Sequence, residues 1–163
     1  IIGAKTDLRI GIASGNASVG NTGSTRKFKY GPLGETVNLA SRLQGAAKSF
    51  GAHILLNETT AGALPETTGL VTRPLGPMRL VNINAVVKAY EVLPVGQTGA
   101  GELAECFRRL VSALEAGEVG TLADTINLAV ARFPDDLPTR CLAQRLADGE
   151  LLINEALWHF DTK

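Results

Sequence analysis

Asn38 and Arg42 are the residues whose types and spacing point most directly to chemistry. They lie four positions apart in the stretch GPLGETVNLASRL, residues 31–43. Residues four apart on a helix project from the same face, so both side chains can reach one target. The amide offers a donor and an acceptor, and the guanidinium carries a permanent charge. The pair therefore predicts a local site for an anionic ligand.

A helix must present this pair, and the flanking pattern predicts one. Gly34 precedes the periodic run, and Gly51 stands where a left-handed C-terminal cap is expected. Periodicity alone favours a structural role for the pair, as the polar edge of this helix with Arg42 paired to a carboxylate such as Glu35. The apolar stripe consists of Leu39, Leu43, Ala46 and Phe50.

The rest of the first half has the pattern of a sheet with short connections. The predicted order is strand, strand, helix, strand, short helix, strand, strand, which is typical of an α+β fold with helices packed on a sheet. The predicted strands are 8–14, 26–30, 53–56, 69–81 and 85–94; a Gly-Asn turn leads from the first into residues 17–23, and Asn57 is expected to cap the short helix.

The pattern changes to a period of about four beyond residues 93–102, so we divide the chain into residues 1–95 and 96–163. The second part is predicted to be a small all-α tail. Its predicted helices are 102–117, 121–133 and 134–149, and the apolar piece 150–160 is either a fourth helix or a docking tail.

Composition narrows the possible partners and compartment. The net charge is zero, so no global field favours nucleic acid or an anionic membrane. Cys106 and Cys141 lack metal-ligand spacing and fit free thiols in a reducing compartment, so we expect a cytoplasmic segment without membrane contact. The chain has no signal-peptide pattern and starts without methionine, which suggests a piece of a longer protein.

Residues 8–93 resemble the C-terminal half of a class III adenylate or guanylate cyclase catalytic domain. The order R-I-G-I-x-x-G, then G-N-x-G, then Y-x-x-x-G-x-x-V-N-x-A-x-R-L carries the resemblance, and the closing pieces RPLG and AYEVL extend it. It implies a partial ferredoxin-like domain, a mostly antiparallel sheet with packed helices. With this motif around them, Asn38 and Arg42 are better read as site residues than as a helix edge.

The resemblance also implies an activity and its partners. Such enzymes convert ATP, or less often GTP, into the 3′,5′-cyclic monophosphate and pyrophosphate with two divalent metal ions, Mg or Mn. They work as dimers with each site at the interface. Asn38 and Arg42 match the asparagine and arginine that one wall supplies. Gly34, before the helix N-terminus, and Gly31 are expected near the nucleotide.

Three departures from the family pattern keep alternatives open. The metal-binding aspartates belong to an earlier segment, and Asp7 is the only aspartate of the first part, so we expect no metal ligands here and no activity of this chain alone. Gly31 replaces an aspartate or threonine that helps to read adenine in many adenylyl cyclases. The loop 81–83 lacks the usual lysine, although basic residues at 26, 27 and 29 could substitute. The alternatives are a guanylate cyclase, or a catalytically degenerate regulatory or nucleotide-binding module.

Residues 113–136 resemble a tetratricopeptide-like helical hairpin. One such repeat cannot bury both of its faces alone, so it must pack on the first half or on a partner chain. Trp158 and Phe160 suit such docking. The tail is expected to regulate the domain or stabilise its dimer, or else to act as a protein-interaction scaffold.

Overall fold

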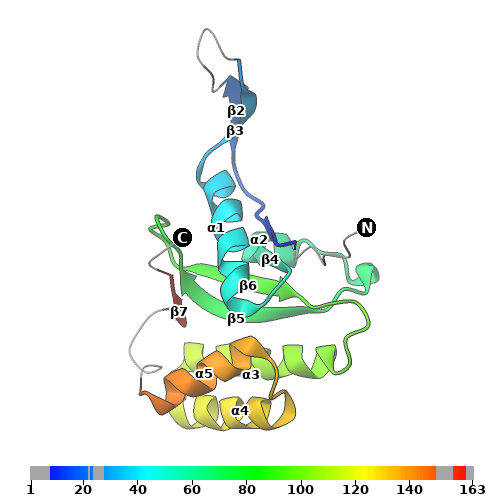
Figure 1. Ribbon diagram of the computed structural model, residues 1–163, viewed down its shortest axis with the longest axis vertical. Coiled ribbons are helices and arrows are strands. Elements are labelled where there is room, and N and C mark those ends of the chain that lie inside the picture. The colour runs from blue at the N-terminus through cyan, green and yellow to red at the C-terminus, as the bar shows by residue number, and fades with distance from the viewer. Residues whose placement is uncertain (1–7, 22, 24–27, 150–155, 161–163) are drawn as a thin grey trace, which may run out of the picture.

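The structure is a computed structural model that describes residues 8–21, 23, 28–149 and 156–160 (Figure 1). A central sheet carries α1 above it and a layer of helices below it, and a two-stranded arm projects from the far end of α1. The fold is α+β, as predicted. The elements are β1 (Ile10–Ile12), β2 (Ser18–Asn21), β3 (Tyr30–Leu33), α1 (Glu35–Phe50), β4 (Ile54–Asn57), α2 (Glu58–Gly62), the 3-10 turn η1 (Glu66–Thr68), β5 (Thr72–Arg79), β6 (Val87–Val92), α3 (Ala100–Ala116), α4 (Val119–Arg132), α5 (Leu137–Ala147) and β7 (Trp158–His159).

The central sheet has the strand order β1-β4-β6-β5-β7. Strand β6 pairs antiparallel with both β4 and β5, whereas β1 runs parallel to β4 and β7 runs parallel to β5. A register shift between Pro74 and Gly76 marks a bulge in β5. The parallel pair β1–β4 requires a crossover, which the arm and α1 provide.

Gly11 allows α1 to cross β1 at very close range. A Cβ atom at this position would lie 2.1 Å from the Ala40 carbonyl oxygen and 2.4 Å from the Gln44 nitrogen, both backbone atoms of α1. Any side chain would push the helix away from the strand. Glycine is therefore a packing requirement, and this contact helps to set where α1 lies.

Helix α1 has the predicted ends. It starts directly after Gly34, whose φ of 132° favours glycine, and it stops at Gly51 in the left-handed conformation with φ of 63°. The predicted stripe is confirmed, with Leu39 only half-buried at its upper end. The buried residues of the helix are Leu43, Ala46, Ala47 and Phe50.

The predicted strand at residues 26–30 is wrong in position. Residues 26 and 27 lie outside the described part, Phe28 and Lys29 precede the strand, and β3 occupies Tyr30–Leu33. Strand β3 contains Gly31 and Pro32, two residue types that are depleted in strands. They are accepted because, among the described residues, β3 pairs on one side only, with β2, where Pro32 lies opposite Val19.

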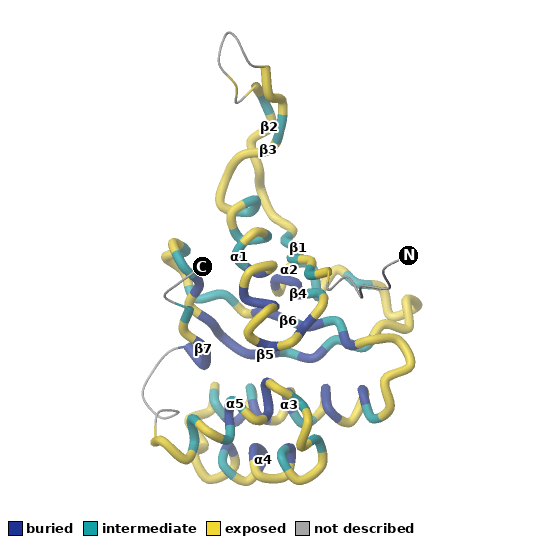
Figure 2. The backbone as a smooth tube through the Cα atoms, viewed as in Figure 1, coloured by how far each residue is buried: buried dark blue, intermediate teal, exposed yellow. Residues whose placement is uncertain are grey.

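The three predicted helices of the tail are present, and they share one hydrophobic core with the sheet. Helix α3 packs against β5, and α4 and α5 follow it in the layer below (Figures 1 and 2). The core includes Phe50 of α1, Leu75 of β5, Phe107 of α3 and Leu142 of α5. Within the described residues no helix is long and apolar enough to cross a membrane.

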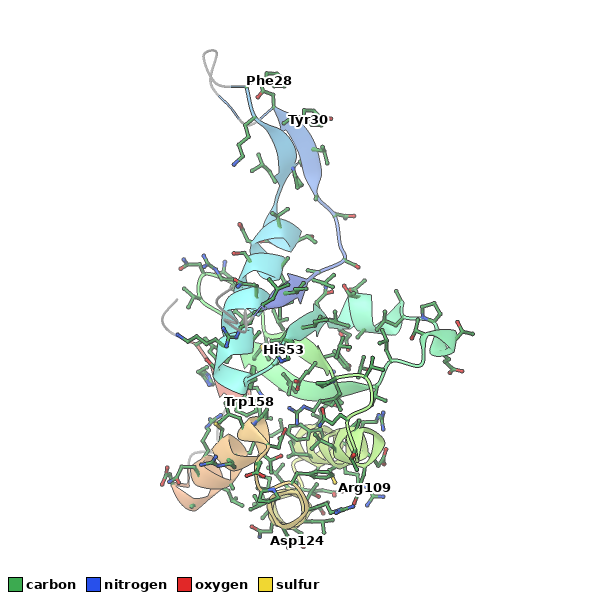
Figure 3. The ribbon with its side chains drawn as sticks, turned by 45° about the vertical axis from the view of Figure 1, so that its right-hand side comes forward. Phe28, Tyr30, His53, Arg109, Asp124 and Trp158 are labelled. Carbon is green, nitrogen blue, oxygen red and sulfur yellow. The ribbon has the colours of Figure 1, made fainter. Side chains whose placement is uncertain are left out.

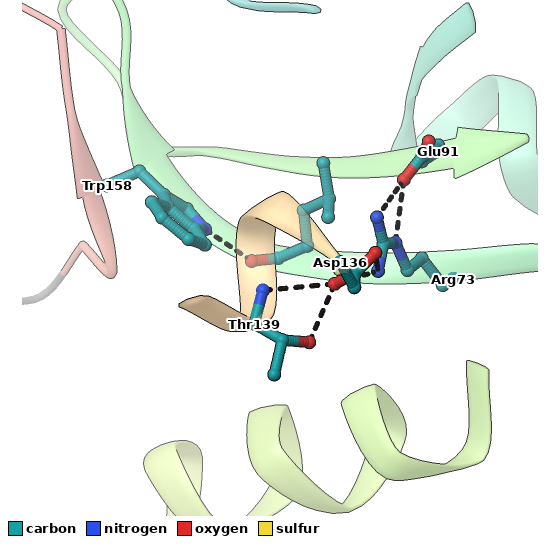
Figure 4. Close-up of polar contacts among 6 residues, drawn as sticks. Arg73, Glu91, Asp136, Thr139 and Trp158 are labelled. Atoms are coloured by element: carbon teal, nitrogen blue, oxygen red, sulfur yellow. Dashed lines mark hydrogen bonds and ion pairs between the residues drawn. The ribbon is translucent and has the colours of Figure 1, made fainter. Parts of the chain in front are cut away.

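A buried ionic network joins the sheet to the helical layer (Figure 4). Arg73 of β5, only 2% exposed, donates from Nε to Glu91 of β6 at 2.6 Å and from one terminal nitrogen to both oxygens of Asp136 at 2.8 Å. Asp136 also caps α5, accepting from the Thr139 backbone nitrogen at 3.0 Å. The guanidinium lies 4.7 Å from the ring centre of Phe107. The tail is thus fixed on the domain by specific polar contacts.

The last apolar piece docks on the sheet. Residues 150–155 lie outside the described part, and 156–160 contribute the short strand β7 rather than helix. The Trp158 indole is buried, donates to the Leu75 carbonyl at 2.6 Å and meets the Phe50 ring edge-on at 4.7 Å. Of the two predictions for this piece, the described residues agree with the docking tail.

Candidate functional site

Arg42 and Asn38 lie one turn apart on α1, as predicted, in different surroundings. Arg42 is half-buried, and its Nε is shielded from solvent without a hydrogen-bond partner among the described residues. A buried donor without an acceptor is costly, so this guanidinium is suited to an acceptor from outside the described residues. Asn38 is exposed. The structural alternative for Arg42 was an ion pair with a carboxylate such as Glu35. No such ion pair is present among the described residues.

Arg42 lines an open groove of about 1020 Å³ beside the second half of α1. The opposite wall is formed by the turn after β5 and by β7. None of the described residues that line it is acidic, and the lining mixes cationic, polar and apolar side chains. They are Ser41, Arg42, Gln44, Gly45, Ala46, Lys48, Ser49, Leu80, Val81, His159 and Phe160.

The start of α1 is held by a polar contact to the segment that follows β1. The Thr36 hydroxyl donates to the Asn16 carbonyl at 2.6 Å. The Asn57 side chain accepts from the Ser14 backbone nitrogen at 3.1 Å and donates to the Ser14 carbonyl at 3.0 Å, which ties the ends of β1 and β4 together. Asn57 was predicted only as a helix cap, and it fills that role as well by accepting from the Thr60 nitrogen. These bonds help to fix where Asn38 and Arg42 point.

Gly34 and Gly31 occupy different parts of the molecule. Gly34 is the residue before α1, and its carbonyl accepts from the Asn38 nitrogen at 3.2 Å. Gly31 lies in the arm opposite Gly20, where a Cβ atom would meet open space. Neither glycine lines the groove. Their predicted roles near a nucleotide remain predictions.

Two further candidate residues at the groove were not predicted from the sequence. Lys48 lies in the last turn of α1, and His159 lies on β7; both line the groove together with Val81 of the lysine-free loop. Lys29, proposed as a substitute for that lysine, is on the exposed arm away from the groove lining. The sequence carries no local signal for His159, because it reaches the groove only through tertiary pairing of β7 with β5.

The described residues do not fit a metal centre. Nowhere in residues 8–21, 23, 28–149 and 156–160 do three His, Cys, Asp or Glu side chains converge as a metal ion would need. Asp7 lies outside this part of the chain. The groove residues can donate hydrogen bonds to an anion, but they do not form a ligand set for divalent cations.

The part of the chain that contains Asn38 and Arg42 is similar to known proteins. Residues 3–92 match the family model described as "Adenylate and Guanylate cyclase catalytic domain", a range that includes β1 to β6 and all of α1. The helices α3 to α5 and the strand β7 lie beyond the matched range.

Two curated relatives are adenylate cyclases. The chain is 33% identical over 87 residues to Adenylate cyclase 1 of Rhizobium meliloti (strain 1021), covering 53% of this chain and 13% of that protein. It is 36% identical over 68 residues to an adenylate cyclase of Anabaena cylindrica, covering 40% of this chain and 14% of that protein. The chain thus spans only a small part of these relatives.

Two solved structures are also similar. The adenylyl cyclase CyaB from P. aeruginosa aligns with a TM-score of 0.45 at 30% identity, over 55% of this chain and 43% of that one. A bacterial light-regulated adenylyl cyclase aligns with a TM-score of 0.46 at 20% identity, over 61% of this chain and 28% of that one.

Proposed function

Because the chain belongs to the adenylate and guanylate cyclase catalytic domain family, we propose that it supplies one wall of an adenylate cyclase site. The reaction forms 3′,5′-cyclic AMP and pyrophosphate from ATP at the interface of two cyclase domains. One observation carries the proposal: within the matched range, Arg42 lines a groove while its buried Nε lacks a partner among the described residues.

Arg42 is suited to stabilise the charge that develops during cyclisation. The ribose 3′ oxygen attacks the α-phosphorus, the bond to the pyrophosphate oxygen breaks, and negative charge builds on the phosphoryl oxygens. A planar guanidinium stays charged and directs several donors at such oxygens. A donor already desolvated by the protein interacts more strongly with this charge than a donor in water.

Asn38 is suited to orient the ribose for in-line attack. It lies one turn before Arg42 on the same face of α1 and is exposed, so a ligand held by both side chains would extend along the helix toward the arm. The amide can donate to one sugar oxygen and accept from another. Its contribution is positioning of the reacting atoms.

The projecting arm supports pairing with a second cyclase domain, as a homodimer or with another cyclase half. Its large apolar side chains face solvent: Val19 is 61% exposed, Phe28 75%, Tyr30 68% and Leu33 56%. Phe28 and Tyr30 project from the outer part of the arm, far from the core of this chain (Figure 3). A cluster of this kind marks an interaction surface.

Cyclases of this family use divalent metal ions, which lower the barrier for displacement at phosphorus. In the family pattern the aspartates that bind these ions belong to an earlier segment, so we infer that the metal ligands lie outside the part of the chain that the structure describes. The free cysteines Cys106 and Cys141 agree with a reducing, cytoplasmic setting.

GTP is an alternative substrate, because Gly31 stands where many adenylyl cyclases have an aspartate or threonine that helps to read adenine.

A second candidate is a catalytically degenerate cyclase domain that regulates an active partner or binds nucleotide as an effector. Gly31 and the lysine-free loop at residues 81–83 favour it.

Product analysis separates the two candidates. A protein that includes this chain and the segment before it is incubated with Mn²⁺ and either ATP or GTP, and products are separated by chromatography. The proposal predicts cyclic AMP and pyrophosphate in equal amounts from ATP. Nucleotide binding without any cyclic product would favour the degenerate domain, and cyclic GMP alone would identify a guanylate cyclase.

A further inference from the structure

One wall of the groove beside Arg42 comes from outside the matched range. The family match ends at residue 92, whereas β7 lies at Trp158–His159. The helical layer between them brings the chain back to the edge of the sheet, next to β5 (Figure 1). Residues added after the cyclase domain thus line the same groove as its arginine.

The position of His159 is fixed by its neighbours on both sides. The Leu157 nitrogen donates to the Pro77 carbonyl at 2.7 Å, and the Phe160 nitrogen donates to the Arg79 carbonyl at 3.0 Å. Trp158 is anchored in the core, close to the C-terminal end of α1 (Figure 3). Side chains alternate along a strand, so burial of Trp158 turns His159 outward, where it is exposed.

The groove chemistry suits a polyphosphate. Arg42, Lys48 and His159 provide nitrogen donors from two separate elements, and none of the described lining residues would repel an anion. Arg42 is suited to bidentate contact with phosphate oxygens, and Lys48 adds a mobile point charge. The volume of the groove, about 1020 Å³, leaves room for a chain of phosphate groups rather than a single one.

We propose that β7 contributes His159 as a phosphate-contacting residue of the cyclase site, acting with Lys48 in place of the lysine that the 81–83 loop lacks. This inference rests on the proposed function, since it assigns a further contact in the same site. It makes the tail part of the substrate groove. The ligand class is the triphosphate of a nucleotide or its pyrophosphate product.

The two histidines of the chain allow a direct test with an internal control. Only His53 and His159 are present. His53 is exposed in the bend before β4, which β6 and β5 separate from β7 in the sheet. The imidazole signals of the full chain are followed by NMR during titration with inorganic triphosphate, and calorimetry gives Kd for the wild type, His159→Ala and His53→Ala.

The inference predicts that the His159 signals shift with triphosphate while those of His53 stay in place. Loss of one hydrogen bond to a charged phosphate should raise Kd about 5- to 10-fold in His159→Ala, with no change in His53→Ala. Lys48→Gln should weaken binding similarly, and Arg109→Gln, an exposed arginine on α3, should not. The fluorescence of the single tryptophan, Trp158, checks that β7 stays docked in each variant.

An unmoved His159 signal, an equal loss of affinity in both histidine variants, or no binding of triphosphate would each overturn the inference. The proposed function fails differently. Cyclic AMP formation that depends on Arg42 with an unaffected His159→Ala variant would keep the function and remove the His159 contact. Binding that depends on Arg42 and His159 without cyclic product would keep the contact and remove the cyclase activity.

Discussion

Gly11 helps to set the position of Arg42, because the backbone atoms that lie against it belong to Ala40 and Gln44, on either side of Arg42 in α1. Its lack of a side chain lets the backbone of α1 lie against β1. The same helix contains Gly45, where a Cβ atom would point into open space. The two glycines therefore provide a matched pair for measuring how tightly α1 is held.

Gly11→Ala should destabilise the protein by about 3 kcal/mol, because the new methyl group overlaps backbone atoms that cannot move independently. Gly45→Ala should instead stabilise it by about 0.5–1 kcal/mol through helix propensity. Urea unfolding gives both values. Equal effects of the two substitutions would mean that α1 is not seated closely on β1.

Glu91 should give the stability of the protein a distinctive pH dependence. Burial raises the pKa of its carboxyl above the ordinary 4.5, because lost hydration outweighs the attraction of Arg73, a guanidinium that also serves Asp136. Folding thus favours the neutral acid. Its contribution to the free energy of unfolding is present below about pH 4.5 and is lost as pH rises through the raised pKa.

The stability difference between wild type and Glu91→Gln should therefore fall as pH is raised from 4.5, as followed by urea unfolding at a series of pH values. Glu105→Gln is the control of opposite sign, because a hydrogen bond from Arg108 lowers the pKa of that carboxyl, and its contribution to stability is lost as pH falls below about 4.5. If the free energy of unfolding of the wild type, relative to Glu91→Gln, grows with pH instead, then the attraction of Arg73 outweighs the lost hydration of the Glu91 carboxyl.

At the scale of elements, the arm formed by β2 and β3 is the part that gains least stability from the rest of this chain. Among the described residues, strands β2 and β3 pair only with each other, and a two-stranded ribbon is marginally stable in water. Its exposed aromatic residues are consistent with burial against a second domain.

The double variant Phe28→Ser with Tyr30→Ser should weaken self-association at least about 10-fold, because burial of two aromatic rings contributes several kcal/mol to an interface. Sedimentation velocity measures the change. Leu128→Ser, on the outer face of α4 and 57% exposed, should leave self-association intact. If the α4 variant weakens it and the arm variant does not, the pairing surface lies in the tail.

Elements with local signals could be predicted from the sequence, and those formed by distant pairing could not. Helix α1 has glycines at both ends and a regular stripe, so its bounds were predicted correctly. Strand β7 has two residues, and its run of apolar residues fits a helix equally well until β5 is in place. Arg42 became a candidate through its motif, whereas Lys48 and His159 became candidates only when the fold brought them to one groove.

At the scale of the whole molecule, the sheet and the helical tail share one core and a buried ionic network. The sequence suggested a boundary near residue 95 from the change of periodicity, which reports local structure and not packing. The helix α3 covers β5, and β7 returns to the sheet. We therefore expect the two parts to depend on each other for stability.

Unfolding should be a single cooperative transition. Trp158 fluorescence reports on β7, and far-ultraviolet circular dichroism reports on all helices, so the two urea curves should coincide. Arg73→Met should shift both curves together to lower urea concentrations, since it leaves the buried Glu91 and the half-buried Asp136 without their cation. Two separate transitions would mean that the tail is an independent domain.

The turnover of Arg42→Ala tests the central claim most directly. The variant is made in a protein that also contains the segment before this chain, and cyclic AMP formation is measured with Mn²⁺ and ATP beside Arg109→Ala, a matched exposed arginine on α3. The account predicts that kcat falls about 100-fold or more in Arg42→Ala and is unchanged in Arg109→Ala, because Arg42, unlike Arg109, stabilises the transition-state charge. An Arg42→Ala protein with the kcat of the wild type would contradict it.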